Sequence, residues 1–265
     1  MEKFKKPSGI LKHGIPLSED CPKCHGTGWV TYQSDDGTEE IYGYPVMIDY
    51  AKRCNCMTNV FARDLQDRTE FPSMYHDCDI YKFDWDCYGV DMADTKKIAF
   101  SFFNDFEKWQ AQGKGLYIWS KTPGSGKTFL SACIGKSVMM RTQKTIKYVT
   151  PIGYMDSVSA SYNNKDIPDP SKAYRECSLL ILDDLGTQIQ SDWHAQELFK
   201  LIDGRISNGL LTIITSNYDV PSLKMDERIK SRILKSTITL HMPEVSIRNK
   251  KAGEERKEFL EKLLT

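Results

Sequence analysis

Hydrophobic and polar positions follow two alternating patterns in the C-terminal part of the chain. Short apolar runs rich in β-branched residues alternate with longer stretches in which apolar residues recur at helical spacing. Helical spacing is clearest at residues 128–140 and 193–207. The apolar runs predict five strands, at residues 116–120, 146–150, 179–183, 211–216 and 237–240. Strands that alternate with helices are typical of a parallel sheet covered by helices on both faces, so we predict an α/β fold.

The chain before this region divides into two further parts. Residues 1–60 are rich in turn-forming residues and contain four cysteines, which predicts a small domain with little core of its own. Residues 61–114 have the pattern of a linker that ends in an amphipathic connecting helix at 95–109. The predicted α/β domain then occupies residues 115–265, and its last stretch, 254–264, has the apolar spacing of a lid helix.

A glycine-containing loop joins the first predicted strand to the first predicted helix. Two glycines in this loop allow successive backbone N–H groups to turn inward, which suits a polyphosphate. We expect Lys127 to reach the β- and γ-phosphates of ATP and the Thr128 hydroxyl to hold Mg²⁺. Lys121 departs from the usual motif, which has glycine at this position. The residues predicted to bind ATP are Pro123, Gly124, Ser125, Gly126, Lys127, Thr128 and Phe129.

Polar residues follow two of the predicted strands. Asp183 and Asp184 end the aliphatic run at 179–182, and Asn217 ends the next strand along the chain. We expect Asp183 to share the Mg²⁺ site with Thr128 and Asp184 to polarise the attacking water. Asn217 is a candidate to orient that water near the γ-phosphate. A turn opened by the two aspartates is the structural alternative, but the phosphate loop upstream favours an ATPase.

The order of these motifs resembles the ATPase domain of bacterial and phage replicative helicase loaders of the DnaC/DnaI type, which belong to the AAA+ class of P-loop NTPases. The resemblance covers about residues 77–248 and is shared with the IstB-type transposition ATPases. It implies that Arg232, or Arg228 as its competitor, reaches the nucleotide of a neighbouring subunit, and that Arg248 senses nucleotide within its own subunit. Guanidinium groups suit these roles because they stay charged and bind phosphate oxygens in pairs.

The second aspartate departs from the pattern of AAA+ motors. Those proteins commonly have glutamate where this chain has Asp184, whereas two consecutive aspartates are familiar among the loaders. A carboxylate that is one methylene shorter places the water less well. The resemblance therefore implies an ATPase that hydrolyses ATP slowly and works as a switch.

Four cysteines in the N-terminal part are spaced like the ligands of a metal ion. Cys21 and Cys24 form a C-x-x-C pair, and Cys54 and Cys56 form a C-x-C pair about 30 residues later. Four thiolates suit tetrahedral Zn²⁺, so we predict a zinc site. The shorter second pair leaves His25 open as a substitute ligand, and unligated thiols are the alternative to zinc.

The residues between the two cysteine pairs carry a second expectation. Residues 31–50 have the pattern of a hairpin that can carry a docking surface. In helicase loaders of the DnaI type, a small zinc-bound N-terminal domain grips the helicase. The resemblance implies the same role for residues 1–60.

Charge and composition narrow the possible partners. Lys and Arg total 36, Asp and Glu total 36, and the net charge of zero excludes a uniformly basic DNA-coating protein. The net charge is zero because regions of opposite charge offset each other. Residues 31–100 carry 14 acidic and 7 basic side chains, whereas residues 224–265 carry 11 basic and 7 acidic ones. This balance favours a protein as the main partner, with DNA contact confined to one basic face.

Localisation follows from what the sequence lacks. No apolar run approaches the roughly 18 residues that a membrane span needs, and the first residues do not resemble a secretory signal. We therefore expect a cytoplasmic protein with no membrane partner, in a bacterial cell and possibly phage-encoded.

These observations together predict an ATP-dependent loader of a hexameric replicative helicase onto single-stranded DNA, which self-associates through its ATPase domain. Two alternatives stay open at this stage. One is a transposition helper of the IstB type, which shares the same core, and the other is a zinc-containing adaptor whose nucleotide site is only structural.

Overall fold

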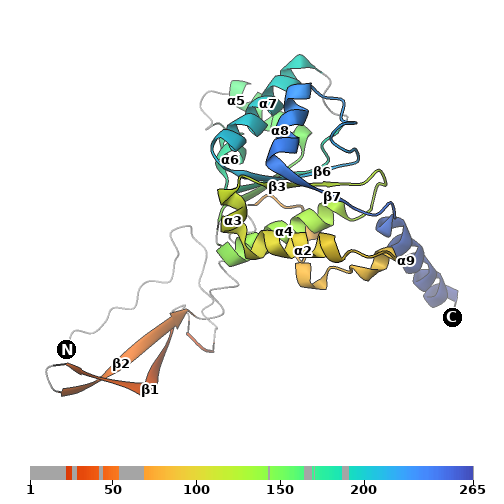
Figure 1. Ribbon diagram of the computed structural model, residues 1–265. Helices are drawn as coiled ribbons and strands as arrows, with labels where there is room; N and C mark the ends of the chain where they lie inside the picture. Colours follow the sequence, from red (N-terminus) through yellow and green to blue (C-terminus); the bar gives the residue numbers. More distant parts are fainter. Residues whose placement is uncertain are drawn as a thin grey trace. The chain divides into compact units, whose positions relative to one another are not determined.

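The structure is a computed structural model (Figure 1). Two compact units make up the chain, Met1–Asp67 and Arg68–Thr265, and the second is called the α/β unit below. The described residues are 22–25, 29–41, 44–53, 69–142, 144–163, 169, 171–186 and 191–264.

The first unit contains an antiparallel hairpin. Strand β1 (Trp29–Ile41) pairs with strand β2 (Tyr44–Arg53), and an irregularity in the register lies between Gln33 and Thr38 of β1. The hairpin expected within residues 31–50 is therefore confirmed, and both strands extend beyond that range. Trp29 pairs with Arg53, so the first residue of β1 lies beside the last residue of β2.

The α/β unit is built on a five-stranded parallel sheet in the order β4-β5-β6-β3-β7. All five strands predicted from the sequence are present, with ends shifted by no more than one residue. Every side chain of β5 is buried, as a central strand covered on both faces requires. The strands are β3 (Gly115–Trp119), β4 (Ile146–Val149), β5 (Leu179–Leu182), β6 (Leu211–Ser216) and β7 (Thr237–His241).

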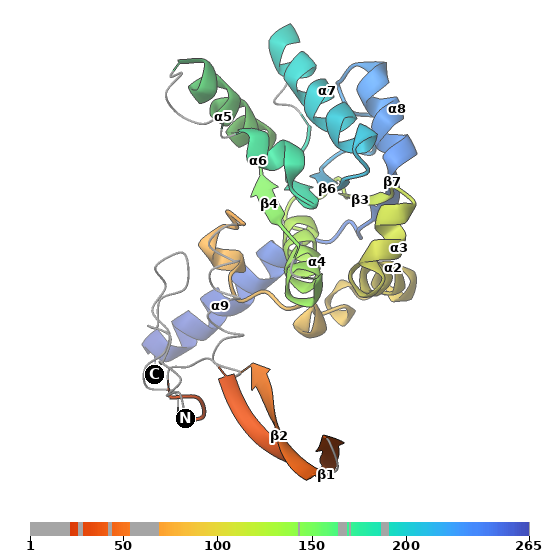
Figure 2. The same cartoon turned by 90° about the vertical axis from the view of Figure 1, so that its left-hand side faces the viewer.

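Helices cover both faces of the sheet. In Figures 1 and 2, α2 and α4 lie on one face, and α5, α7 and α8 lie on the other. The helices are α2 (Ala93–Asn104), α3 (Phe106–Ala111), α4 (Lys127–Thr142), α5 (Pro151–Asn163), α6 (Ser171–Glu176), α7 (Asp192–Ser207), α8 (Glu227–Ser236) and α9 (Ile247–Leu264). The predicted fold class, an α/β P-loop architecture, is confirmed by this arrangement.

The segment at residues 69–111 packs into the α/β unit, whereas the sequence indicated a linker up to residue 114. Its helical part is broken at Asp105, so that α2 and α3 replace the single helix expected at 95–109. Phe102, Phe103 and Phe106 are almost completely buried there. Burial of these aromatic side chains removes apolar surface from water, which stabilises the packing of this segment within the α/β unit.

Three short 3₁₀ helices precede α2, and aromatic side chains of this segment pack against Phe129 of α4. They are η1 (Ser73–Tyr75), η2 (Ile80–Lys82) and η3 (Asp86–Tyr88). Tyr75, Phe83 and Tyr88 are buried in this segment. Within the described part of the chain, no helix is long and apolar enough to cross a membrane.

One buried arginine joins three elements of the α/β unit. Arg205 of α7 is 1% exposed. Its guanidinium donates hydrogen bonds to the carbonyl oxygens of Tyr174 (2.8 Å) and Cys177 (3.0 Å), to that of Leu211 (2.5 Å) and to Thr212 Oγ1 (3.0 Å). Burial lowers the pKa of Arg205, and the neighbouring Cys177 opposes this shift. The side chain therefore satisfies backbone acceptors at the end of α6 and the start of β6 that no water reaches.

We expect Arg205→Ala to destabilise the α/β unit by about 3 kcal/mol or more, because it leaves several buried carbonyl oxygens without donors. Thermal and urea unfolding of the purified protein measure this change. The matched control is Arg141→Ala, since Arg141 is exposed at the end of α4. Equal unfolding midpoints for the two variants would contradict the prediction.

Candidate nucleotide-binding site

The residues singled out in the sequence converge at one edge of the sheet. Because β3, β5 and β6 are parallel neighbours or next neighbours, the loops that follow them open at the same edge. A cleft of about 560 Å³ lies there. It is lined by Met74, Tyr75, Phe83, Asp84, Cys87, Tyr88, Pro123, Gly124, Ser125, Gly126, Lys127, Thr128, Phe129, Asp183, Asp184, Thr215, Asn217, Ile247 and Arg248.

Two glycines give the phosphate loop (residues 121–128) its shape. Gly124 has φ +77° and Gly126 has φ +89°, in the left-handed region that other residues rarely adopt. A Cβ atom on Gly126 would lie 2.7 Å from Tyr88 Oη, and one on Gly124 would lie 2.9 Å from Arg248 Cβ. Since α4 begins at Lys127, its first N–H groups and its positive end face the cleft.

Lys127 is enclosed by its own loop. Its side chain is 7% exposed, and Nζ donates to Ser120 O (3.1 Å), Thr122 O (3.1 Å) and Ser125 Oγ (3.2 Å). Burial lowers the pKa of Lys127, and the carboxylates of Asp184, Glu244 and Asp183 act in the opposite direction. An ammonium held by neutral oxygens in a buried site gains most from an anionic ligand, so phosphate oxygens are its expected partners.

Asp183 is held between two neighbouring strands. Tyr148 Oη on β4 donates to Asp183 Oδ2, and Thr215 Oγ1 on β6 donates to Asp183 Oδ1, each at 2.6 Å. Burial of Tyr148 and the charge of Asp183 both raise the pKa of the tyrosine, so it stays a donor. The carboxylate is oriented towards the cleft that Thr128 also lines, and the two side chains fit the hard oxygen donors that Mg²⁺ prefers.

Asp184 and Asn217 form a hydrogen-bonded pair at the next position. Asn217 Nδ2 donates to Asp184 Oδ1 at 3.0 Å, and the Asp184 backbone N–H donates to Thr215 Oγ1 at 2.8 Å. Asp184 has φ +61°, in the left-handed region that residues other than glycine rarely adopt. Partial burial and the charge of Asp183 raise the pKa of Asp184, while Lys127 lowers it. A carboxylate with a raised pKa is a better proton acceptor.

The three predicted arginines divide between two places. Arg248, at the start of α9, lines the cleft, and its backbone N–H donates to Gly124 O at 3.2 Å. Arg228 and Arg232, on α8, are not part of the lining. Both guanidinium groups lie over the ring of Phe199, at 5.4 and 5.0 Å from its centroid. This arrangement fits the expected contact of Arg248 with the nucleotide of its own subunit. Arg228 and Arg232 lie outside this cleft, so they do not share that role.

Sequence reasoning missed several residues of the site. Tyr148 and Thr215 orient the acidic pair, and the aromatic side chains of Tyr75, Phe83, Tyr88 and Phe129 form a wall of the cleft. In this wall the ring of Phe83 stacks on that of Phe129, with 5.8 Å between the ring centroids. Tyr88 Oη donates a hydrogen bond to Ser125 O at 2.9 Å. The dense aromatic residues of 71–88 were the available signal for a surface that can receive a flat base.

The predicted zinc site falls largely outside the described residues. Cys24 is buried in the turn at 22–25, whereas Cys21, Cys54 and Cys56 lie outside the described part of the chain. Among the residues that are described, no group of three or more metal-ligating side chains comes together. Zinc binding therefore stays a prediction.

The fold and the cleft define a class of protein. A parallel sheet in this strand order places a phosphate loop, an acidic pair and a polar strand-end residue at one edge. This is the architecture of a P-loop NTPase of the AAA+ class.

Comparison with known proteins agrees with that class. Residues 62–239 match the family described as the bacterial DnaA ATPase domain, and the chain belongs to this family. The chain is 26% identical over 154 residues to a protein named replicative helicase loader DnaC, from Buchnera aphidicola subsp. Baizongia pistaciae. That match covers 55% of this chain and 61% of the relative, so the chain spans less than two thirds of that protein. The expected resemblance to DnaC-type loaders is confirmed.

Solved structures show the same fold. The DnaC helicase loader superposes with a TM-score of 0.51 at 22% identity, over 64% of this chain and 99% of that one. A replication initiator DnaA bound to AMPPCP and single-stranded DNA has a TM-score of 0.53 at 17% identity, over 65% of this chain and 51% of that one. At these identities the likeness establishes the AAA+ fold of the α/β unit.

We expect Lys127→Ala to weaken ATP and ADP binding about 10- to 100-fold, the loss that corresponds to charge-assisted hydrogen bonds worth about 1.5–3 kcal/mol. Titration with a fluorescent ATP analogue measures the dissociation constant. Lys108→Ala is the control, because Lys108 is exposed on α3 and pairs only with Asp105 among the described ionic contacts. The prediction is wrong if both variants bind nucleotide as the unaltered protein does.

We expect Asp184→Asn to keep nucleotide binding, to lose ATP hydrolysis by about 100-fold or more, and to unfold at a higher temperature near pH 7.5. The reason for the last effect is that the folded protein raises the pKa of Asp184, so ionisation costs stability above the unfolded value of about 3.9. This cost disappears as the pH falls below that value, so the difference in unfolding temperature should shrink towards pH 4. Unfolding scans between pH 4 and 8 test the sign, and a difference that grows towards acid pH would refute it.

Proposed function

We propose that this protein is an ATP-dependent loader that places a replicative helicase on single-stranded DNA during the initiation of DNA replication. The observation that carries the proposal is the single cleft that gathers Lys127, Asp183 and Arg248 with the phosphate loop. The relative named replicative helicase loader DnaC, together with the family match, supports the loader function for an ATPase unit of this kind.

The residues of the cleft have distinct roles in ATP hydrolysis. Lys127 leaves the loop carbonyls and binds the β- and γ-phosphates, while Thr128 and Asp183 hold Mg²⁺, which neutralises phosphate charge. Asn217 orients Asp184, which accepts the proton of the attacking water as the water oxygen bonds to the γ-phosphorus. The bond from the γ-phosphorus to the bridging oxygen breaks, and ADP and phosphate leave.

The α8 arginines are suited to a second subunit. The Arg228 side chain is 75% exposed, and its guanidinium pairs with Asp226; Arg232 Nε lies 2.9 Å from Asp203 Oδ1. Both arginines share the Phe199 ring, which holds two like charges close together. A neighbouring subunit's γ-phosphate offers such cations a stronger partner than an exposed carboxylate does. ATP therefore promotes self-association of the ATPase unit through Arg232 or Arg228, and slow hydrolysis reverses it.

The N-terminal unit is the part of the chain proposed to bind the helicase. Its hairpin brings Trp29 and Arg53 together, which is the arrangement needed for cysteine pairs before and after the hairpin to approach one ion. In this proposal Cys21, Cys24, Cys54 and Cys56 hold Zn²⁺, and the hairpin carries the surface that contacts a hexameric helicase.

Single-stranded DNA is the proposed second partner. Residues 224–265 have a basic excess of 11 to 7, and a DnaA structure of the same fold is described as bound to single-stranded DNA. The proposed cellular setting is the bacterial cytoplasm, either as a host protein or during phage infection.

The decisive experiment combines the full-length protein with the replicative helicase of its host or phage. We expect co-purification that depends on ATP, and increased loading of the helicase onto a closed circle of single-stranded DNA. Lys127→Ala should lose this stimulation, and Arg232→Ala should lose ATP-dependent self-association while it still binds ATP. The Lys108→Ala protein is the matched control.

Other outcomes would point to other functions. Selective binding of a transposase in place of the helicase would make the protein a transposition helper. Full loading by Lys127→Ala would make it an adaptor with a structural nucleotide site. Metal analysis that finds less than about one zinc per chain in freshly prepared protein would reject the zinc site.

A further inference from the structure

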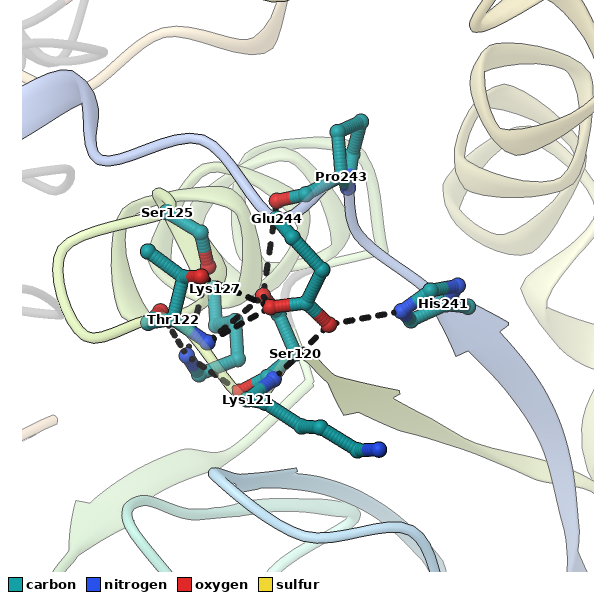
Figure 3. Close-up of polar contacts among 8 residues, drawn as sticks. All are labelled: Ser120, Lys121, Thr122, Ser125, Lys127, His241, Pro243 and Glu244. Carbon is teal, nitrogen blue, oxygen red and sulfur yellow. Dashed lines mark hydrogen bonds and ion pairs between the residues drawn. The ribbon is translucent and has the colours of Figure 1, made fainter.

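A carboxylate outside the cleft holds the start of the phosphate loop. Glu244 lies in the loop between β7 and α9, and Figure 3 shows its contacts. Its Oε1 accepts from the Lys121 backbone N–H (3.0 Å) and lies 2.9 Å from His241 Nε2. Its Oε2 accepts from the Thr122 backbone N–H (2.7 Å), Thr122 Oγ1 (2.7 Å) and Ser120 Oγ (3.0 Å). One side chain thus receives donors from three consecutive residues: Ser120, which precedes the loop, and the first two residues of the loop, Lys121 and Thr122.

The planarity of the peptide group links this carboxylate to Lys127. The N–H of Lys121 and the carbonyl of Ser120 belong to one trans peptide, so they point in opposite directions. Glu244 accepts from the N–H, and Lys127 Nζ donates to the carbonyl at 3.1 Å. Glu244 therefore fixes the orientation of a carbonyl that in turn directs the lysine.

The charge on Glu244 is secure at the pH of the cell. Partial burial of the Glu244 carboxyl group by itself raises its pKa. Hydrogen bonds from His241, Thr122, Lys121 and Ser120 outweigh this effect and lower the pKa of Glu244 to about 2. The side chain is still 39% exposed. Its effect on the loop consequently comes from directed, charge-assisted hydrogen bonds and not from burial.

The same C-terminal segment contacts the phosphate loop at a second point. The backbone N–H groups of Ile247 and Arg248 donate to Gly124 O, at 3.0 and 3.2 Å. At the start of the segment, the Met242 N–H donates to Trp119 O at 2.8 Å, and the His241 ring stacks on Trp119 at 4.2 Å. The segment therefore follows the loop from the end of β3 to Gly124.

This arrangement accounts for the unusual residue at position 121. Lys121 is not among the described residues with positive φ, so its backbone does not need glycine. Glu244 supplies from outside the loop the restraint that orients the first peptides.

We propose that Glu244 is a positioning residue of the nucleotide site. It holds the first peptides of the phosphate loop so that Lys127 can bind the phosphates of the nucleotide. It also couples phosphate binding to the segment that carries Arg248. This proposal rests on ATP binding in the cleft, as argued under the proposed function. The coupling is mechanical: a phosphate that draws Lys127 away from Ser120 O changes the peptide that Glu244 holds, and the segment before α9 responds.

The test compares Glu244→Ala, Glu244→Gln and Glu244→Asp in the full chain, with Glu176→Gln on α6 as the matched control, since Glu176 pairs with Lys172 on the surface. We expect Glu244→Ala and Glu244→Gln to bind ATP and ADP about 10-fold more weakly, with partial recovery in Glu244→Asp. Adenosine, which lacks phosphates, should bind all variants equally. A general loss of structure would weaken adenosine as well, so this contrast separates positioning from folding.

Hydrogen exchange tests the loop without any ligand. The amides of Lys121 and Thr122 should exchange faster in Glu244→Gln than in the unaltered protein, and exchange at Ile247 and Arg248 should lose its response to ATP. Unchanged ATP affinity in all three variants overturns the role of Glu244 and leaves the proposed function standing. Failure of the unaltered protein to bind ATP overturns both.

Discussion

The site depends on the parallel pairing of β5, β6 and β3. In a parallel sheet all carboxyl ends lie at one edge, so three loops that are far apart in the sequence open into the same space. The phosphate loop follows β3, the aspartates follow β5, and Asn217 follows β6. The strands can pair in this way only because their side chains are buried on both faces, by α4 on one side and by α7 and α8 on the other.

Charge in the cleft is arranged at a cost to stability. Two carboxyl groups and one ammonium lie partly or wholly buried, and the direction of the pKa shifts of Lys127 and Asp184 shows that each would be easier to keep neutral. Tyr148 and Thr215 hold Asp183 through short hydrogen bonds that prevent its relaxation. A bound nucleotide with Mg²⁺ would pair with these buried charges and so reduce their free-energy cost. ATP binding would therefore stabilise the conformation of the unit that holds the nucleotide.

The C-terminal segment, residues 242–248, contacts the nucleotide site at two places. It brings Arg248 to the cleft and Glu244 to the outside of the phosphate loop, and α9 continues from it. On the opposite helical layer, α8 presents Arg228 and Arg232 around Phe199. Under the proposals above, a nucleotide that moves the phosphate loop would act on the C-terminal helix of its own subunit, and the α8 arginines of a neighbouring subunit would contact that nucleotide.

The local sequence was sufficient for the five strands, for the phosphate loop, and for Asp183 and Asn217 as polar ends of buried strands. These features depend on periodicity and on residue types within about ten positions, which a single chain displays. Only the tertiary structure showed that residues 69–111 pack onto the α/β unit, and that Tyr148, Thr215 and Glu244 orient the site. Those roles come from contacts between residues 31 to 124 positions apart, and no local pattern encodes such sequence separations.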